Sequence, residues 1–319
     1  MDLIKEKRCS LCDKGSVIYL RKHSGHSLCS ECLINSTERI IYGTISKFQM
    51  LNPKDKIIVG FSGGKDSVAL LFNLIKIQKR TYGSKPVIAL SVDEGIESYN
   101  GVNMQIAKDF CIKYEIEHKI VSFKEIFGKT LDEIADKIKL KKNFRYQFDY
   151  CAILRRRLLN IEAKKLGGTV LALGFNLTNL AEIYLTNILF NRFDIIENQY
   201  FFQNNNAKSK YLRKIMPLMR IPEEEIQYYL ESKKLDYYHS FYPYQEKYLI
   251  LRKKVLDFID ILKFKSPEIE FNLFNGFLEL SEIHDRKKKD FNMINCIKCD
   301  YPTRNPEICN YCEILEDLN

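Results

Sequence analysis

The sequence lacks any apolar run long enough to cross a lipid bilayer. None of its 319 residues falls in an uninterrupted apolar stretch of the roughly 18 residues that a spanning helix needs. Segment 1–10 carries charges with no apolar run behind them, so we expect no secretory signal. Low-complexity sequence is confined to Gln203–Asn206. These absences argue against a membrane or secreted protein and predict a cytoplasmic one, where cysteines stay reduced.

The composition is that of an ordinary folded protein with a basic balance. Hydrophobic residues make up 45% and charged residues 29%, which argues against a disordered chain. The formal net charge of +9 favours an anionic partner such as nucleic acid.

The sequence divides into three blocks. Residues 1–34 and residues 290–319 each contain two Cys-x-x-Cys pairs, and residues 35–289 alternate strand-like apolar runs with helical patterns. Such alternation is typical of an α/β fold, here a Rossmann-like parallel sheet with a small metal-organised module at each end. The expected strands are Lys56–Phe61, Val87–Val92, His118–Ser122 and Thr169–Gly174. The expected helices are Ser67–Lys79, Gly101–Tyr114, Leu131–Lys139, Ala152–Leu166, Leu177–Asn191, Glu223–Lys233 and Gln245–Leu262.

The strongest local signal is Ser62-Gly63-Gly64-Lys65-Asp66-Ser67, between a buried strand pattern and a helical one. The two glycines let backbone N–H groups approach a phosphate, and the helix directs its positive end to the same point. Lys65 adds a charge, and Ser62 and Ser67 add hydroxyl donors. The spacing is not that of a Walker loop. It matches the PP-loop of the N-type ATP pyrophosphatases, the alternative being an incidental tight turn.

Asp93 follows the next expected strand. Ligands bind at the carboxyl edge of an open parallel sheet. Asp93 is therefore a candidate to contact adenosine or a Mg²⁺ ion on pyrophosphate, or else it is a solvated turn residue.

Cysteine spacing predicts two structural zinc sites. Cys9 and Cys12 pair with Cys29 and Cys32 across sixteen residues, a zinc-ribbon spacing. At the other end, nine residues separate two further pairs, which are Cys296, Cys299, Cys309 and Cys312. Four thiolates leave no open position on the ion, so both sites are interpreted as structural. Disulfides are the alternative, and His23 and His26 are interpreted as bystanders.

Over nearly its whole length the chain resembles the tRNA 2-thiolation group of PP-loop enzymes, which includes TtuA- and TtcA-like proteins and the eukaryotic cytosolic thiouridylases. The segments that carry the resemblance are the N-terminal cysteine pairs, Ser62–Ser67, Asp93–Gly95, Tyr150–Cys151, Arg155–Arg157, Leu173–Leu177, Met216–Leu218, Tyr242–Tyr244 and the C-terminal pairs. The resemblance implies an adenine nucleotide alpha-hydrolase-like domain that uses ATP and Mg²⁺. It also implies adenylation of the C2 carbonyl oxygen of a tRNA pyrimidine, after which a nucleophile displaces AMP. A homodimer and a sulfur-carrier protein as partner are further expectations.

The site residues expected on this basis fall into three groups. Ser62, Gly63, Gly64, Lys65, Asp66, Ser67, Asp93 and Gly174 would hold ATP. Lys65, Asp66 and Cys151 would be catalytic, Cys151 because a helix start and nearby arginines lower a thiol pKa. Basic residues in Lys137–Arg145 and the run Arg155, Arg156 and Arg157 would contact tRNA, with a solvated helix face as the alternative.

The chain departs from this group at two places. Thiolating members hold an iron–sulfur cluster, or carry sulfur, on three cysteines, and here those positions are Cys151, Leu154 and Tyr242. One thiol is too few for a cluster, which makes such a cluster doubtful. The Gly-His-Asn-x-Asp-Asp segment reads Gly174-Phe175-Asn176-Leu177-Thr178-Asn179, without its histidine and carboxylates.

These observations predict an ATP-dependent enzyme that adenylates a tRNA base, with 2-thiolation as the first expectation. Two alternatives stay open. An amine could displace AMP, as in lysidine synthesis, or the chain could be a catalytically impaired tRNA-binding paralogue. The sequence names neither the tRNA position nor the donor of the nucleophile.

Overall fold

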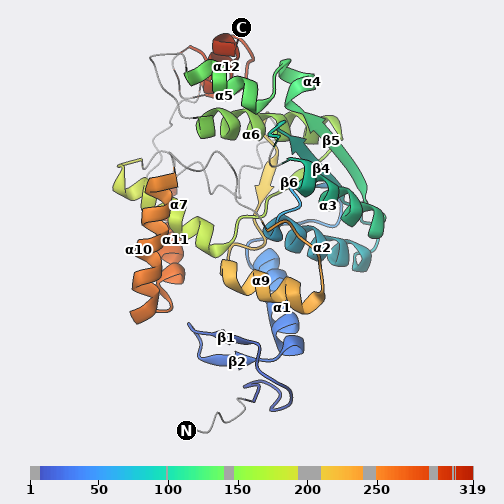
Figure 1. Ribbon diagram of the computed structural model, residues 1–319, viewed down its shortest axis with the longest axis vertical. Coiled ribbons are helices and arrows are strands. Elements are labelled where there is room, and N and C mark those ends of the chain that lie inside the picture. The colour runs from blue at the N-terminus through green and yellow to red at the C-terminus, as the bar shows by residue number, and fades with distance from the viewer. Residues whose placement is uncertain are drawn as a thin grey trace.

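A five-stranded parallel sheet organises the centre of the molecule, with strand order β5-β4-β3-β6-β7 (Figure 1). The computed structural model describes residues 8–97, 100–139, 147–192, 210–239, 249–286, 294–303, 305 and 307–318. The strands of the sheet are β3 (Ile57–Gly60), β4 (Ile88–Asp93), β5 (Glu117–Ser122), β6 (Val170–Ala172) and β7 (Arg213–Ile215). Because all neighbouring strands run parallel, their carboxyl ends meet at one edge.

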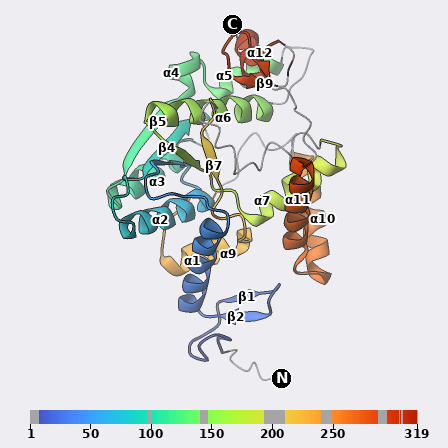
Figure 2. The same cartoon turned by 180° about the vertical axis from the view of Figure 1, so that it is seen from behind.

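Alternate residues of the strands enter two hydrophobic cores, one on each face of the sheet. Ile57 and Val59 of β3 belong to one core and Ile58 belongs to the other, as the twofold side-chain period requires. The helices that contribute to the first core are α1 (Ser30–Lys47), α2 (Lys65–Arg80), α3 (Asn100–Lys113), α7 (Leu177–Leu189), α9 (Glu223–Lys233) and α11 (Ile269–Arg286). Those of the second core are α4 (Phe123–Phe127), α5 (Leu131–Lys139), α6 (Gln147–Lys165) and α12 (Asn310–Leu318). Helix α10 (Leu249–Lys265) packs against α7 and α11 (Figure 2).

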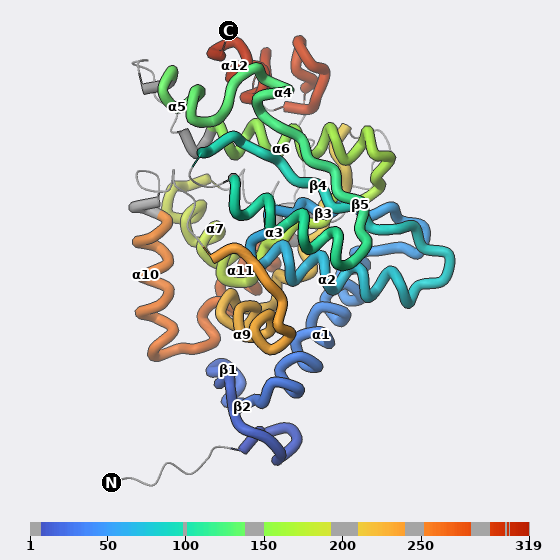
Figure 3. Tube along the Cα trace, turned by 45° about the vertical axis from the view of Figure 1, so that its right-hand side comes forward, coloured from blue at the N-terminus to red at the C-terminus, as the bar shows by residue number. Residues whose placement is uncertain are grey.

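The two cysteine-rich segments lie at opposite ends of the longest axis of the molecule (Figure 3). The first contains the hairpin β1 (Tyr19–Arg21) and β2 (His26–Leu28), and the last contains β8 (Ile294–Asn295) and β9 (Pro302–Thr303). The last segment is anchored by α12, where Lys137 Nζ donates to the Leu318 carbonyl at 2.6 Å and the Tyr150 hydroxyl donates to Asp317 at 2.9 Å.

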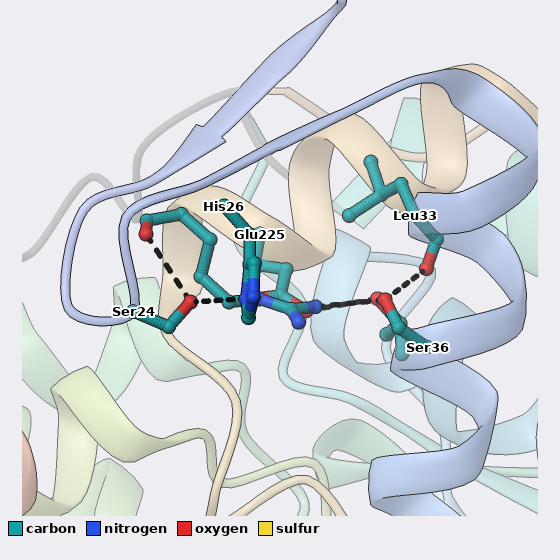
Figure 4. Close-up of polar contacts among 7 residues, drawn as sticks. Ser24, His26, Leu33, Ser36 and Glu225 are labelled. Carbon is teal, nitrogen blue, oxygen red and sulfur yellow. Dashed lines mark hydrogen bonds and ion pairs between the residues drawn. The ribbon is translucent and has the colours of Figure 1, made fainter. Parts of the chain in front are cut away.

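The N-terminal hairpin is attached to α9 by a buried ion pair (Figure 4). Arg21 Nε donates to Glu225 Oε2 at 3.0 Å, and its Nη2 donates to Glu225 Oε1 at 2.5 Å and to Ser36 Oγ at 2.9 Å. Thr37 Oγ1 also donates to Glu225, at 2.9 Å. The side chain of Glu225 is fully buried, so these donors replace the water that a carboxylate would otherwise require.

The predicted fold class, the four predicted strands and the core of each predicted helix are confirmed, with shifted ends. Helix α6 begins at Gln147, earlier than predicted, so Cys151 is not at its start. Helix α1 crosses residue 34, where the N-terminal block was predicted to end. Helix α10 was predicted from Gln245 and is described from Leu249. Strands β1, β2, β7, β8 and β9 and helices α1, α4, α11 and α12 were not predicted. Residues 140–145 of the basic segment, as well as Tyr242, lie outside the described residues. Among the helices that are described, none has the length and apolar character to cross a membrane.

Candidate nucleotide site and four-cysteine sites

The phosphate loop joins the end of β3 to the start of α2, at the carboxyl edge of the sheet. Gly63 has a φ of +78°, and a Cβ atom there would lie 2.5 Å from the backbone oxygen of Asn103. No other residue type fits this position without moving the α3 backbone. Gly64 caps the N-terminus of α2, so the unpaired N–H groups of the first helical turn face the loop.

Serine hydroxyl groups hold the loop in its shape. Ser67 Oγ donates to the Gly64 carbonyl at 2.8 Å and accepts from the Ser62 N–H at 3.3 Å. The hydroxyl oxygens of Ser62 and Ser67 lie 3.3 Å apart. The six residues predicted to bind phosphate therefore form a short loop that continues into the first turn of α2.

Lys65 and Asp66 begin α2 and carry the charges of the loop. Lys65 Nζ lies 2.5 Å from a carboxylate oxygen of Glu223, the first residue of α9. Burial lowers the pKa of Lys65, but the carboxylates of Asp66 and Glu223 outweigh burial and raise it above its ordinary value. Burial raises the pKa of Asp66 to about 6, although Lys65 and the Asn176 amide act in the opposite direction. The lysine is thus a firmly charged cation, held by a carboxylate.

The segment that departs from the family pattern packs directly on the phosphate loop. A Cβ atom at Gly174 would lie 3.1 Å from the Asp66 backbone, so the prediction that Gly174 belongs to this site agrees with its position. Asn176 is fully buried, and its amide donates to Asp66 Oδ1 at 3.0 Å. Asn179 completes a capping box with Asn176 at the start of α7. Thr178 Oγ1 accepts the backbone N–H of Glu223 at 3.1 Å.

Asp93 ends β4, which lies next to β3 at the same edge of the sheet. Its Oδ1 accepts the backbone N–H of Gly95 at 2.9 Å, which fixes the turn after the strand. Glu94 is buried and accepts a hydrogen bond from Arg155 Nη1 at 2.9 Å. Asp93 therefore lies at the same sheet edge as the loop, while Arg155 is held to that edge by a carboxylate that sequence reasoning did not single out.

Cys151 lies in the second turn of α6 and is only 1% exposed. It shares the second hydrophobic core with Leu154, which is fully buried. The sequence predicted a thiol at the start of a helix, and the earlier start at Gln147 removes that part of the argument, because the dipole acts mainly at the first turn.

The three arginines of α6 point to different surroundings. Arg156 is exposed, whereas Arg157 is 6% exposed. The Arg157 guanidinium carbon lies 3.7 Å from the ring centroid of Tyr301, and the rings of Tyr211 and Tyr311 lie at 5.5 Å and 5.1 Å. Its Nη2 also lies 3.4 Å from Cys309 Sγ. Arg157 therefore faces the C-terminal four-cysteine site and is enclosed by protein, while Arg156 keeps the surface position that contact with tRNA requires.

Both predicted groups of four cysteines come together. In each group, which is Cys9, Cys12, Cys29 and Cys32 or Cys296, Cys299, Cys309 and Cys312, the sulfur atoms lie within 4.8 Å of one another. These eight cysteines are thiols, not disulfides. Burial raises the pKa of Cys9, but backbone N–H donors outweigh burial and lower it to about 6. The same balance lowers the pKa of Cys296 to about 6.

Sequence reasoning missed Glu223 and Tyr238 as neighbours of the phosphate loop. The Tyr238 N–H donates to the Gly63 carbonyl at 2.8 Å, so the segment that follows α9 runs along the loop. Neither residue is close to the loop in sequence. The only local signal was the acidic first turn of α9, which is ordinary at a helix N-terminus.

Comparison with known proteins also identifies a PP-loop domain. The PP-loop domain family matches residues 37–257. A probable sulfurtransferase of Methanocaldococcus jannaschii is 31% identical over 97% of this chain and 88% of its own length. Cytoplasmic tRNA 2-thiolation protein 1 of Xenopus laevis is 30% identical over 98% of this chain and 88% of its own length.

A solved structure extends the similarity to three dimensions. The U34-tRNA thiolase NcsA from Methanococcus maripaludis, solved with its 4Fe-4S cluster, superposes with a TM-score of 0.81 at 30% identity. The match covers 99% of this chain and 98% of that one. The phosphate loop, the parallel sheet and these full-length matches together show that the chain belongs to the PP-loop family, in the group that contains the tRNA 2-thiolation proteins.

Proposed function

We propose that this protein is an ATP-dependent enzyme of tRNA 2-thiolation. The observation that carries the proposal is the complete phosphate loop, with Lys65 and Asp66 at the start of α2, in a chain that aligns along its length with tRNA 2-thiolation proteins. The net charge of +9 suits a tRNA partner, and the name of the relatives supports a cytoplasmic location.

The proposed chemistry begins with attack of a tRNA base carbonyl oxygen on the α-phosphorus of ATP. An oxygen–phosphorus bond forms, the bond to the β-phosphate breaks, and pyrophosphate leaves. Lys65 and the N–H groups at the start of α2 would stabilise the negative charge that develops on the leaving group. A sulfur nucleophile then attacks the activated carbon and AMP leaves. Arg155 and Arg156 would guide the tRNA backbone to the edge of the sheet.

Each four-cysteine site is proposed to hold one zinc ion. A tetrahedral ion with zinc–sulfur bonds of about 2.3 Å separates its ligands by about 3.8 Å. The sulfur atoms of Cys12 and Cys29 are 3.8 Å apart, and those of Cys299 and Cys309 are 3.6 Å apart. Both distances fit a single ion with four thiolate ligands. Such an ion would stabilise segments too small to form a core of their own.

The residues of this chain do not fit a 4Fe-4S cluster such as the one present in the structure of NcsA. The position expected for a second cluster thiolate is Leu154, whose side chain is buried in the second hydrophobic core beside Cys151. Clusters of this kind need cysteine at nearly every protein-held corner. We therefore propose that sulfur comes from a separate donor, such as a sulfur-carrier protein, without a cluster on this chain.

Leu154 also favours a second candidate function. If no sulfur chemistry survives on α6, the activated base could be attacked by an amine instead. The nucleotide site would serve both reactions in the same way, because base activation precedes the choice of nucleophile.

The proposal is tested by incubating the protein with ATP and tRNA and measuring AMP and pyrophosphate. We expect release that depends on tRNA, and a loss of about 100-fold in Lys65→Ala. Lys79→Ala removes an exposed lysine at the other end of α2 and is the matched control. Equal rates of AMP and pyrophosphate release in all three proteins would refute the proposal that this protein cleaves ATP at the phosphate loop.

Cys151→Ser separates the two nucleophiles. Thiolation through Cys151 predicts that ATP cleavage persists while modification of the tRNA nucleoside, read by mass spectrometry, is lost. Full retention of the modified nucleoside would exclude Cys151 as a sulfur carrier, and its mass would show whether sulfur or an amine was added.

A further inference from the structure

The lysine of the phosphate loop has a carboxylate partner at the place where phosphate would bind. Lys65 Nζ and Glu223 Oε1 are 2.5 Å apart, and the two side chains are 26% and 40% exposed. Solvent reaches this pair, so a ligand can reach it too. A triphosphate that binds here therefore competes with Glu223 for the charge of Lys65.

Glu223 cannot swing far from the site once displaced, because the segment that carries it is fixed at several points. Its backbone N–H is bonded to Thr178 Oγ1 at 3.1 Å. Two residues later, Glu225 is tied to the N-terminal hairpin by Arg21. In the segment that follows α9, the Tyr238 N–H donates to the Gly63 carbonyl at 2.8 Å. The released carboxylate consequently remains beside the phosphates.

Glu223 also lies where this chain lacks the two aspartates that the motif of thiolating members would supply. Thr178 and Asn179 occupy the two positions where the motif of thiolating members has aspartate, and their side chains instead bond to Glu223 and Asn176. Glu223 thus brings a carboxylate to Lys65 from a different element, while its backbone is bonded to Thr178. A magnesium ion on nucleotide phosphates is usually held by one or two protein carboxylates and water.

We propose that Glu223 is the residue that makes this site select magnesium-bound ATP over metal-free ATP. This inference rests on the proposed function, since it requires that the loop binds ATP. In the empty site, Glu223 neutralises Lys65. In the loaded site, its carboxylate faces the magnesium ion on the phosphates, directly or through water. Metal-free ATP, with about twice the negative charge of its magnesium complex, meets the same carboxylate as a repelling charge.

The test measures nucleotide affinity without tRNA, by calorimetry, for magnesium-bound ATP and for ATP with a chelator. We expect the unaltered protein to prefer magnesium-bound ATP by about tenfold or more, and Glu223→Gln to reduce that preference to about twofold, chiefly by binding metal-free ATP more tightly. Glu223→Asp keeps the charge and should restore most of the preference. Glu224→Gln changes the same charge in the same helical turn, on an exposed side chain, and should behave like the unaltered protein.

Two results would overturn the inference alone: a preference in Glu223→Gln equal to that of Glu224→Gln, or an equal weakening of both forms of ATP, which would indicate mere support of the loop. Absence of ATP binding by the unaltered protein would overturn the proposed function and this inference together. Melting temperatures of the three variants show whether each remains folded.

Discussion

Two opposing effects act on the carboxyl group of Asp66: polar neighbours favour its charged form, and burial favours its neutral form. It lies beside a cation and accepts a hydrogen bond from Asn176, yet burial keeps its pKa near 6. In the unfolded chain its carboxyl has the ordinary aspartate pKa of 3.8. The folded protein thus binds a proton at Asp66 more readily than the unfolded chain does. The ionised form of Asp66 consequently opposes folding at neutral pH, a strain that an approaching magnesium ion or cation would relieve.

Asp66→Asn should therefore stabilise the folded protein at neutral pH. For a carboxyl group whose folded pKa is raised, the favourable contribution is complete below the unfolded pKa and disappears as pH rises through the folded pKa. We expect the variant to gain about 1–2 kcal/mol in the free energy of unfolding at pH 7.5. The gain should be smaller at pH 5 and should be nearly lost at about pH 4, close to the unfolded pKa.

Urea denaturation at pH 7.5 and pH 5 measures this effect. Asn176→Ala is the comparison, because it removes the amide that bonds to Asp66 while leaving the carboxyl group in place. A gain in Asp66→Asn that is the same at pH 7.5 and pH 5 would contradict the assignment of the raised pKa to Asp66.

Residues of the site differed in how far the sequence could predict them. Ser62–Ser67 are contiguous, so the pattern alone predicted the strand, loop and helix that the structure shows around them, and their contact with ATP stays a prediction. Glu223 reaches Lys65 only through the way α9 packs, and no local pattern contains that information. Arg157 was predicted to contact tRNA because it belongs to a basic run, but its ring contacts come from β8–β9 and α12, whose position the sequence did not reveal.

At the scale of elements, helix α6 joins the nucleotide edge of the sheet to the C-terminal module. Arg155 bonds to Glu94 at the sheet edge, and two residues later Arg157 lies among three tyrosine rings beside Cys309. A guanidinium group that donates to a metal-bound thiolate orients that ligand and reduces its charge. The arginine therefore supports the C-terminal four-cysteine site from outside it.

Arg157→Ala should release the C-terminal module. Loss of a buried cation–ring contact and of a hydrogen bond to sulfur is expected to cost about 2–4 kcal/mol in the free energy of unfolding. The zinc content, measured by elemental analysis, should fall from about two ions per chain toward one. Arg156→Ala, one residue earlier and exposed, should keep both ions. An unchanged zinc content in Arg157→Ala would show that the module does not depend on this contact.

For two of the elements that were not predicted, β7 and α11, the structure shows why the sequence pattern was weak. Strand β7 has only three residues, and two of them are charged. It is stable because Arg213 bonds to Asp55 at 2.7 Å, a contact between distant segments. Helix α11 carries a detectable apolar spacing in Phe274 and Phe277, which are buried, but Gly276 between them weakens the helical pattern.

At the scale of the whole molecule, the N-terminal module packs against α9, the helix that also contacts the phosphate loop. Arg21 and Glu225 form a buried ion pair with side chains 9% and 0% exposed, and Tyr19 packs on Tyr228 with ring centroids 5.1 Å apart. Helix α9 is thereby held on one side by the hairpin and on the other by the phosphate loop. Residues two apart on a helix point in different directions, so Glu223 and Glu225 can engage these two partners at once.

Arg21→Met should be strongly destabilising, because it leaves the Glu225 carboxylate buried without its cation. The expected loss is about 3–5 kcal/mol in the free energy of unfolding. Adding Glu225→Gln should recover a large part of it, since the neutral amide oxygen can still accept from Thr37. Chemical denaturation of the single and double variants measures both values.

Arg8→Met is the matched control in the same module. The Arg8–Asp13 pair is exposed, at 74% and 79%, and its loss should cost less than about 1 kcal/mol. A double variant as unstable as Arg21→Met alone would mean that packing, not the buried charge, accounts for the loss.

The separation of the two modules has a consequence for the order in which the chain folds. During synthesis Cys9 through Cys32 emerge before the strands of the sheet, so they could bind an ion before the sheet forms. That module must nevertheless wait for Glu225 before it can dock, a contact of long sequence separation that forms slowly. The C-terminal module has the reverse history. When Cys312 emerges, the residues of α6 have already been synthesised, so Arg157 is available when these four cysteines come together.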